Sequence, residues 1–222
     1  MLTIAVLNQK GGVGKTTLAT NLAAAAWLDR KRTILIDLDR QGSALDWSAA
    51  RGDGSKLEGI ATVKVDKSLA IPRFREITNG YDVVILDGPP RLGDVTRSAA
   101  VAADVVLLPI QPGPFDLWAA SETLEVLDQA DAIRAELGRP SVRRLFVVNR
   151  ASAKTVLARE APAALAKKGE VASVTIHQRI VFAEAAATGE SVLTTDPDGA
   201  AASEIRSLYK ALAKHRRTST EP

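Results

Sequence analysis

Residues 2–17 of the chain read LTIAVLNQKGGVGKTT, and this stretch decides the fold. An apolar run typical of a strand leads into three glycines and then into Lys15, which opens an alanine-rich helical pattern. Gly11, Gly12 and Gly14 let the backbone turn with its N–H groups facing inward, and the positive end of the following helix favours an anion. The order of strand, glycine loop, lysine and helix predicts a loop that holds the phosphates of a nucleotide.

Two residues of this loop set it apart from the general pattern G-x-x-x-x-G-K-[ST]. Gln9 stands where the pattern has its first glycine, and a second lysine, Lys10, precedes the glycines. We expect Lys15 to reach the β- and γ-phosphates and the hydroxyl of Thr16 to bind Mg²⁺. A metabolic kinase with such a loop leaves Lys10 unexplained.

Short apolar runs alternate with helical patterns along the rest of the chain. Runs such as TILID (residues 33–37) and VVILD (residues 83–87) are apolar up to their last residue, as strands covered on both faces are. The alternation predicts an α/β fold in a single domain, with a mainly parallel, twisted β-sheet and helices on both faces. We expect strands at residues 3–7, 33–37, 62–65, 82–87, 104–110, 144–149 and 174–177, and helices at residues 15–29, 69–78, 94–102, 116–137, 154–168, 180–188 and 199–214.

The composition narrows the class of protein. The chain has 222 residues, of which 46% are hydrophobic, and this suits one domain over residues 1–222 with a short basic, polar tail from about residue 214. It has no cysteine, which excludes disulfides, thiolate metal sites and iron–sulfur clusters. Because no apolar run is long enough to span a bilayer and no signal sequence precedes the first strand, we expect a cytoplasmic protein.

Carboxylates end two of the expected strands, at the edge of a parallel sheet where ligands bind. Asp87 ends the strand at residues 82–87 and can hold Mg²⁺, usually through water. Asp37 ends the strand at residues 33–37, and Asp39 follows it by two residues. One of them can support the metal and the loop while the other faces the γ-phosphate and its attacking water. One lysine, one metal ion and one group that orients water suffice for phosphoryl transfer.

Five stretches resemble, in order and spacing, the ParA/MinD group of deviant-Walker ATPases, and most closely its small, ParF-like partition proteins. They are KGGVGKTT (10–17), IDLDRQG (36–42), VVILDGPPRLGDVTRSAA (83–100), LLPIQPGPFD (107–116) and IHQRIVFAEAAATGESV (176–192). The resemblance covers nearly the whole chain. It implies a P-loop enzyme that hydrolyses ATP to ADP and phosphate with Mg²⁺ and forms a homodimer with ATP. In that family the early lysine, here Lys10, reaches across the dimer interface to phosphate bound in the other subunit.

The resemblance assigns a role to each site residue. It makes Lys10, Lys15 and Asp39 catalytic, with Asp39 orienting the hydrolytic water, and it places Thr16, Asp37 and Asp87 at the metal. The nucleotide contacts that it implies are Gly11, Gly12, Val13, Gly14, Lys15, Thr16, Thr17, Pro112 and Asn149. Asn149 and Pro112 belong to the adenine side, although turn chemistry alone also explains an asparagine or a proline after a strand. Arg40 departs from the family, which usually has proline there.

Partition ATPases of this type bind DNA without sequence preference as ATP-bound dimers, and a centromere-binding partner of the ParB or ParG kind stimulates hydrolysis and releases them. The expected DNA contacts are basic residues near the C-terminal helices, namely Arg179, Arg206, Lys210, Lys214, Arg216 and Arg217. Because each cation contacts one phosphate at most, a dimer with twice as many cations binds far more tightly. A solvated helix end, where cations favour the helix C-terminus, explains the same cluster.

Three functions remain open at this point. The first is segregation of a plasmid or a chromosome by a nucleoid-associated ATPase. The second is the positioning of a protein cargo, such as a chemotaxis cluster or a microcompartment, by the same kind of ATPase. The third is a MinD-like membrane switch, which needs an amphipathic C-terminal helix with a bulky apolar face. The stretch SLYKALAKHRRTSTEP (207–222) offers only Leu208, Tyr209 and Leu212 for such a face, so we expect no stable membrane association.

Overall fold

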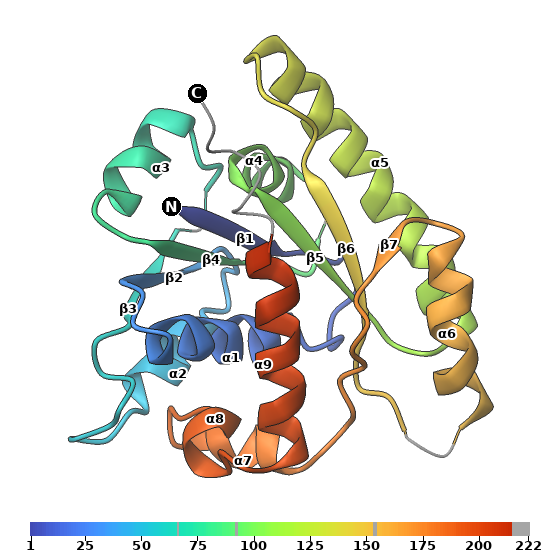
Figure 1. Cartoon of the computed structure of the whole chain (residues 1–222). Helices are drawn as coiled ribbons and strands as arrows, with labels where there is room; N and C mark the ends of the chain where they lie inside the picture. Colours follow the sequence, from blue (N-terminus) through green and yellow to red (C-terminus); the bar gives the residue numbers. More distant parts are fainter. Residues whose placement is uncertain (66, 92, 153–154, 215–222) are drawn as a thin grey trace.

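The computed structural model describes residues 1–65, 67–91, 93–152 and 155–214, apart from the side chains of residues 114, 117 and 118. Within these residues seven strands form one sheet in the order β3-β2-β4-β1-β5-β6-β7, and its strand pairs run parallel (Figure 1). The strands are β1 (Leu2–Val6), β2 (Thr33–Asp37), β3 (Ala61–Lys64), β4 (Val83–Asp87), β5 (Val105–Ile110), β6 (Arg143–Val148) and β7 (Glu170–Val171). The α/β fold with a parallel sheet is confirmed.

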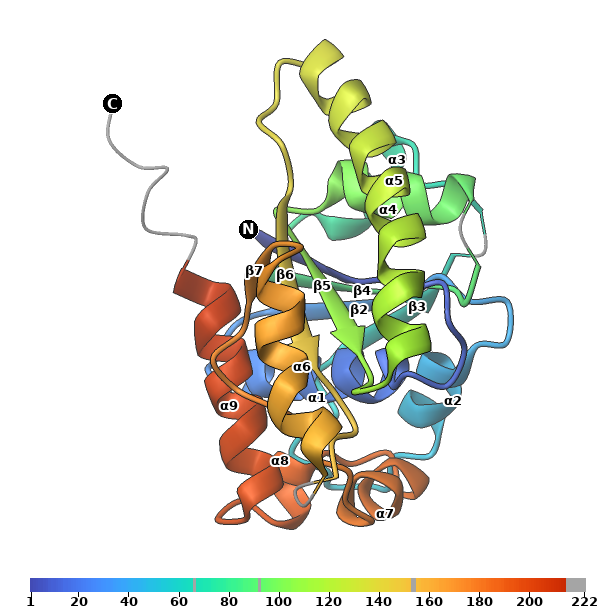
Figure 2. The same cartoon turned by 90° about the vertical axis from the view of Figure 1, so that its right-hand side faces the viewer.

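Helices cover both faces of this sheet. They are α1 (Lys15–Leu28), α2 (Ser43–Ala49), α3 (Ile71–Thr78), α4 (Asp94–Ala102), α5 (Pro114–Glu136), α6 (Val156–Ala166), α7 (Val181–Ala187), α8 (Val192–Thr195) and α9 (Ala200–Ala213). One buried apolar cluster joins α1, α2, α7, α8 and α9 to one face, and a second joins α3, α4, α5 and α6 to the other. Figure 2 shows α9 and α5 on opposite sides of β5 and β6.

The alternation of side chains along each strand explains why the strand sequences are apolar at nearly every position. In β1, Ile4 and Val6 belong to the cluster with α1 and α9, while Ala5 belongs to the cluster with α4 and α5. In β4, Ile85 and Leu86 divide in the same way. Both faces of the central strands are therefore buried, and the strand ends carry the polar residues.

The expected strand at residues 174–177 was wrong. The last strand is β7, at Glu170–Val171, and the segment that follows forms an isolated bridge between Ala151 and His177. The β-branched residues there favour an extended chain, but at a sheet edge strand formation depends on the available partner. The short helices α2 and α8 were not expected. The expected start of α6 at residue 154 and the expected polar tail at residues 215–222 lie outside the described residues.

The sheet brings the sequence motifs together at one edge. The parallel register places Asp37 of β2 beside Asp87 of β4, and Asp87 beside Val6 of β1. The glycine loop follows β1 directly and leads into α1. The ends of β1, β2 and β4 therefore surround one site, as ligand sites of open parallel sheets do.

Candidate active site

The loop between β1 and α1 is built to receive an anion. Gly12 and Gly14 have φ angles of 74° and 91°, in the left-handed region that favours glycine. Gly14 caps α1, so the unpaired N–H groups of the first helical turn open toward the loop. The ammonium of Lys15, which is buried, donates to the carbonyl of Lys10 at 3.0 Å. Burial lowers the pKa of Lys15, and the carboxylates of Asp87 and Asp39 oppose this shift.

Asp87 provides a carboxylate oxygen that has no hydrogen-bond partner in the described part of the chain. Asp87 is 1% exposed, and the atom without a partner is Oδ1. Burial raises the pKa of Asp87 to about 7, while a hydrogen bond with Thr16 lowers it and the neighbouring Asp37 raises it further. A buried carboxylate next to a hydroxyl group, with one oxygen left free, fits the oxygen ligands that Mg²⁺ prefers. The residues present thus fit a magnesium ion at this position.

Asp37 anchors the segment that follows β2. Its Oδ1 accepts the N–H of Asp39 at 3.0 Å, and its Oδ2 accepts the N–H groups of Ala44 at 2.8 Å and Leu45 at 3.2 Å. The carboxylate therefore lies at the N-terminus of α2, where a negative charge is favourable. Asp37 holds the backbone in place, and its contact with the metal stays a prediction.

Asp39 lies in a tight turn at the edge of the nucleotide cavity. Its Oδ1 accepts the N–H of Gln41 at 3.1 Å, and its carbonyl accepts the N–H of Gly42 at 3.1 Å. These two bonds close a turn over residues 39–42, and Asp39 also lines the large cavity described below. Its expected role in orienting water stays a prediction.

Lys10 does not face its own phosphate loop. Its ammonium bonds to Oδ1 of Asp116 at 2.8 Å, and its side chain is 41% exposed while that of Asp116 is 9% exposed. Asp116 lies in the first turn of α5, where a carboxylate suits the helix dipole. Sequence reasoning missed Asp116, because nothing in the spacing pairs it with a lysine 106 residues earlier.

A cavity of about 900 Å³ opens beside the phosphate loop. It is lined by Gly11, Gly12, Gly14, Lys15, Thr16, Thr17 and Asp39, by Asn149 beside the loop, and on its far side by residues of the segment from Ile176 to Ala186. The structure thus brings most of the expected nucleotide contacts together. Val13 is buried, and its carbonyl accepts a hydrogen bond from Asn149 Nδ2 at 2.7 Å. Pro112 lines a smaller neighbouring cavity of about 380 Å³ instead.

Arg150 and Gln111 contact the phosphate loop, and neither was expected from the sequence. The guanidinium of Arg150 donates to the carbonyl of Gly12 at 2.6 Å, and Gln111 Nε2 donates to the same carbonyl at 3.2 Å. Arg150 has a φ angle of 53°, a conformation that is uncommon for a residue with a side chain. The loops after β5 and β6 therefore brace the loop after β1.

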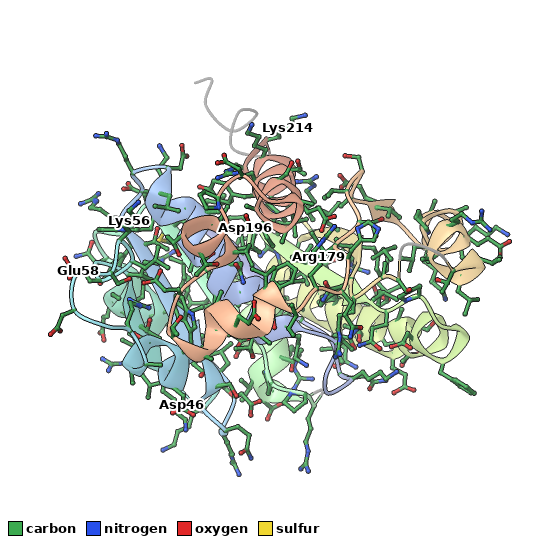
Figure 3. All side chains as sticks on the ribbon, turned by 90° about the horizontal axis from the view of Figure 1, so that it is seen from below. Asp46, Lys56, Glu58, Arg179, Asp196 and Lys214 are labelled. Carbon is green, nitrogen blue, oxygen red and sulfur yellow. The ribbon has the colours of Figure 1, made fainter. Side chains whose placement is uncertain are left out.

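The expected DNA-binding residues fall into three groups. Arg206, Lys210 and Lys214 are exposed on or next to α9, and Arg206 also donates to the carbonyl of Pro197. Arg179 instead forms two hydrogen bonds with Glu204, at 2.6 and 2.9 Å, and lines the large cavity. In Figure 3, which views the molecule from below, Arg179 lies near the centre and Lys214 lies at the end of α9. Arg216 and Arg217 lie outside the described residues.

The opposite side of α9 is apolar and packs into the core. Leu208, Tyr209 and Leu212 are all buried, in the apolar cluster that α9 shares with α1. Across the described ranges, we find no helix with both the length and the apolar character that crossing a bilayer requires.

The chain matches one protein family over most of its length. Residues 4–192 match the family described as the CobQ/CobB/MinD/ParA nucleotide binding domain. The matched region contains the phosphate loop, both carboxylate-bearing strands and the segment that lines the far side of the cavity.

Individual relatives agree with this match. The chain is 34% identical over 234 residues to the chromosome-partitioning ATPase Soj of Thermus thermophilus, with 92% of each chain covered. It is 29% identical over 212 residues to the maintenance of carboxysome distribution protein A of Halothiobacillus neapolitanus, covering 93% of this chain and 94% of that protein. Among solved structures, cobyrinic acid a,c-diamide synthase of Mycobacterium smegmatis with a bound ATP analogue and magnesium has a TM-score of 0.75 at 22% identity, covering 99% of this chain and 97% of that one. This last likeness shows a shared fold.

Proposed function

We propose that this chain, which belongs to the CobQ/CobB/MinD/ParA family and is an ATPase of the ParA/MinD type, acts in DNA segregation. In this proposal, ATP and Mg²⁺ join two copies into a dimer that binds DNA without sequence preference. A centromere-binding partner then stimulates hydrolysis and releases the dimer from DNA. The protein is accordingly a cytoplasmic, nucleoid-associated enzyme.

The placement of Lys10 carries this proposal. Lys15 already points into the phosphate loop of its own chain, so phosphates bound there have their cation. Lys10 is instead paired with Asp116 of α5 and remains partly exposed. A second cation on a flexible stem, whose ammonium is bonded outside its own phosphate loop, is suited to neutralise phosphate charge in another subunit. ATP then joins two chains because each supplies a charge that the other lacks.

The chemistry of hydrolysis follows from the groups around the cavity. Thr16 and Asp87 would hold Mg²⁺, which would supply positive charge to the phosphates. The backbone N–H groups of the loop and the ammonium of Lys15 bind the phosphate oxygens. Asp39 faces the cavity from the turn after β2 and orients the attacking water. Phosphoryl transfer needs this positioning more than it needs a covalent group from the protein.

DNA binding is assigned to α9. Arg206, Lys210 and Lys214 follow one another at intervals of four residues, so they project from the same face of the helix. Three cations on one chain bind DNA weakly, whereas a dimer presents two such faces to one duplex. Nucleotide-dependent dimerisation thereby controls attachment to DNA.

A second function remains a candidate because of one relative. The likeness to the carboxysome distribution protein spans nearly the whole of both chains. An ATPase with the same dimer cycle can position a protein assembly on the nucleoid instead of a DNA molecule. Deletion of the gene separates the two functions, because the first predicts loss of a plasmid or chromosome from daughter cells and the second predicts misplaced protein assemblies.

The test of the main proposal is DNA co-sedimentation with ADP, ATP and a non-hydrolysable ATP analogue, together with size-exclusion chromatography. We expect the wild type to dimerise and bind DNA only with a triphosphate, and Lys10→Ala to lose both properties in every nucleotide state. Lys56→Ala is the matched control, because Lys56 is exposed on the loop after α2 and lies toward the left edge of Figure 3, away from Arg179 near its centre. Equal DNA binding with ADP and ATP would reject the proposal.

A further inference from the structure

The turn over residues 39–42 carries Asp39, and its geometry decides where that carboxylate points. Inside the molecule the turn is anchored by Asp37, which accepts the N–H of Asp39. Within the turn, Asp39 accepts N–H groups from Gln41 and Gly42. Gly42 closes the turn with a φ angle of 79°, a conformation that favours glycine.

A lysine of the neighbouring strand holds the outer side of this turn. Lys64, the last residue of β3, lies beside Asp37 in the parallel register. Its ammonium donates to the carbonyl of Arg40 at 2.7 Å. A Cβ at residue 42 would lie 3.2 Å from this ammonium, so the absence of a side chain on Gly42 leaves room for the contact. Within the described residues, Lys64 is the side chain outside residues 37–45 that donates to the backbone of this turn.

Arg40 lies next to Asp39 within the turn over residues 39–42. It is the second residue of the four, where a proline would fix φ near −65°. Arginine imposes no such restriction, and the N–H of Arg40 donates to no group in the described part of the chain. The charge-assisted bond from Lys64 therefore restrains the residue next to Asp39.

We propose that Lys64 is a positioning residue for ATP hydrolysis, which fixes the turn over residues 39–42 so that Asp39 faces the nucleotide cavity. This inference rests on the proposed role of Asp39 in orienting water. Lys64 itself contacts neither nucleotide nor water in this scheme. Its effect is expected on the hydrolytic step, where small displacements of a reacting group lower the rate strongly.

The test compares Lys64→Met, which keeps the length of the side chain but removes the donor, with Lys64→Arg, which keeps a donor. Single-turnover hydrolysis at saturating ATP, the affinity for ATP and ATP-dependent dimerisation are measured for each variant. We expect Lys64→Met to hydrolyse ATP more slowly, on the order of tenfold, with ATP affinity and dimerisation within about twofold of the wild type. Lys64→Arg and the surface control Lys56→Met are expected to hydrolyse ATP at close to the wild-type rate.

A second substitution separates positioning from a general loss of stability. Arg40→Pro fixes the turn by another route, so the double variant Lys64→Met/Arg40→Pro is expected to recover most of the lost rate. A wild-type rate in Lys64→Met, or an equal loss of ATP affinity and rate, overturns the inference. So does a double variant as slow as Lys64→Met.

Asp39→Asn distinguishes failure of this inference from failure of the proposed function. If Asp39→Asn is inactive while Lys64→Met is normal, only the role of Lys64 is wrong. If Asp39→Asn hydrolyses ATP at the wild-type rate, the role of Asp39 is wrong and the inference falls with it.

Discussion

Gly14 is the most constrained single position of the phosphate loop. A Cβ at residue 14 would lie 2.5 Å from Nδ2 of Asn149, and this amide already donates to Val13. At Gly12, which shares the left-handed conformation, a Cβ would meet no atom within 4 Å. An alanine at residue 12 therefore tests backbone strain alone, whereas an alanine at residue 14 adds a steric conflict.

We expect Gly14→Ala to abolish ATP binding, because either the loop or the Asn149 side chain must shift and the bond from Asn149 to Val13 is disturbed. Gly12→Ala adds only the strain of the left-handed backbone, about 1–2 kcal/mol, and we expect it to retain weaker ATP binding. Titration with a fluorescent ATP analogue, alongside urea unfolding of both variants, measures the difference. Equal ATP affinity in the two variants would show that the contact with Asn149 does not matter.

At this scale the sequence predicts residues whose chemistry is local and misses those that depend on distant partners. Lys15, Thr16 and Asp87 could be placed at one site from the sequence, because the ends of parallel strands lie at one edge of the sheet, and their roles stay predictions. Asp116 and Lys64 could not be assigned, because each acts on a residue far away in the chain. Only the folded structure shows that Lys10 bonds to the carboxylate of Asp116 and that Lys64 bonds to the carbonyl of Arg40.

Among the elements, α9 is tied to the cavity by one carboxylate. Glu204 accepts two hydrogen bonds from Arg179, and its Oε1 lies 2.8 Å from Nδ1 of His177. Burial alone raises the pKa of Glu204, but the bonds from Arg179 and His177 outweigh it and lower the pKa. These bonds fix the segment that lines the far side of the cavity to α9, the helix to which we attribute DNA binding in the proposed function.

Glu204→Gln is expected to lower the free energy of unfolding by about 2 kcal/mol at pH 7, because it removes a charged hydrogen-bond acceptor. The pKa of Glu204 is lower in the folded chain than its unfolded value of about 4.3. Its contribution is therefore complete above that value and is lost as the pH falls through the folded pKa. Urea unfolding at pH 7, and then in steps from about pH 5 to pH 3.5, should show the difference between wild type and Glu204→Gln becoming smaller.

Glu184→Gln serves as the control for this titration, since Glu184 is an exposed glutamate of α7. We expect no comparable change with pH for that variant. A difference between Glu204→Gln and wild type that stays constant down to pH 3.5 would contradict the assignment of the pKa shift to the bonds with Arg179 and His177.

The elements that the sequence predicts well are the long helices and the buried central strands. The central strands and helices such as α1 and α9 were expected within a few residues of their observed ends. The errors are short elements. Helix α2 has 7 residues and depends on Asp37 for its N-terminus, while β7 has 2 residues and depends on β6 as a partner. Local sequence carries little information about either contact.

In the whole molecule, the two faces of the sheet carry different parts of the proposed mechanism. One face carries both α1, which follows the phosphate loop, and the basic helix α9, together with α2, α7 and α8. Helices α3 to α6 cover the opposite face (Figure 2). A mainly parallel sheet with helices on both faces followed from the pattern of apolar runs, but the order of its strands did not. The division of labour between the faces did not, because no sequence pattern states which helices share a face.

We expect the basic face of α9 to govern the attachment to DNA. In the proposed dimer, replacing Arg206, Lys210 and Lys214 by glutamine removes cations from both copies of α9. Each cation that contacts a phosphate contributes about 0.9 to the slope of log K against log salt concentration. We therefore expect a markedly smaller slope and weaker DNA binding, with unchanged ATP-dependent dimerisation, when fluorescence anisotropy is measured at several salt concentrations. A control triple with Arg75, Arg159 and Lys167 replaced by glutamine removes the same charge from exposed positions on or next to α3 and α6. If both triples reduce the slope equally, net charge rather than the face of α9 governs the attachment to DNA.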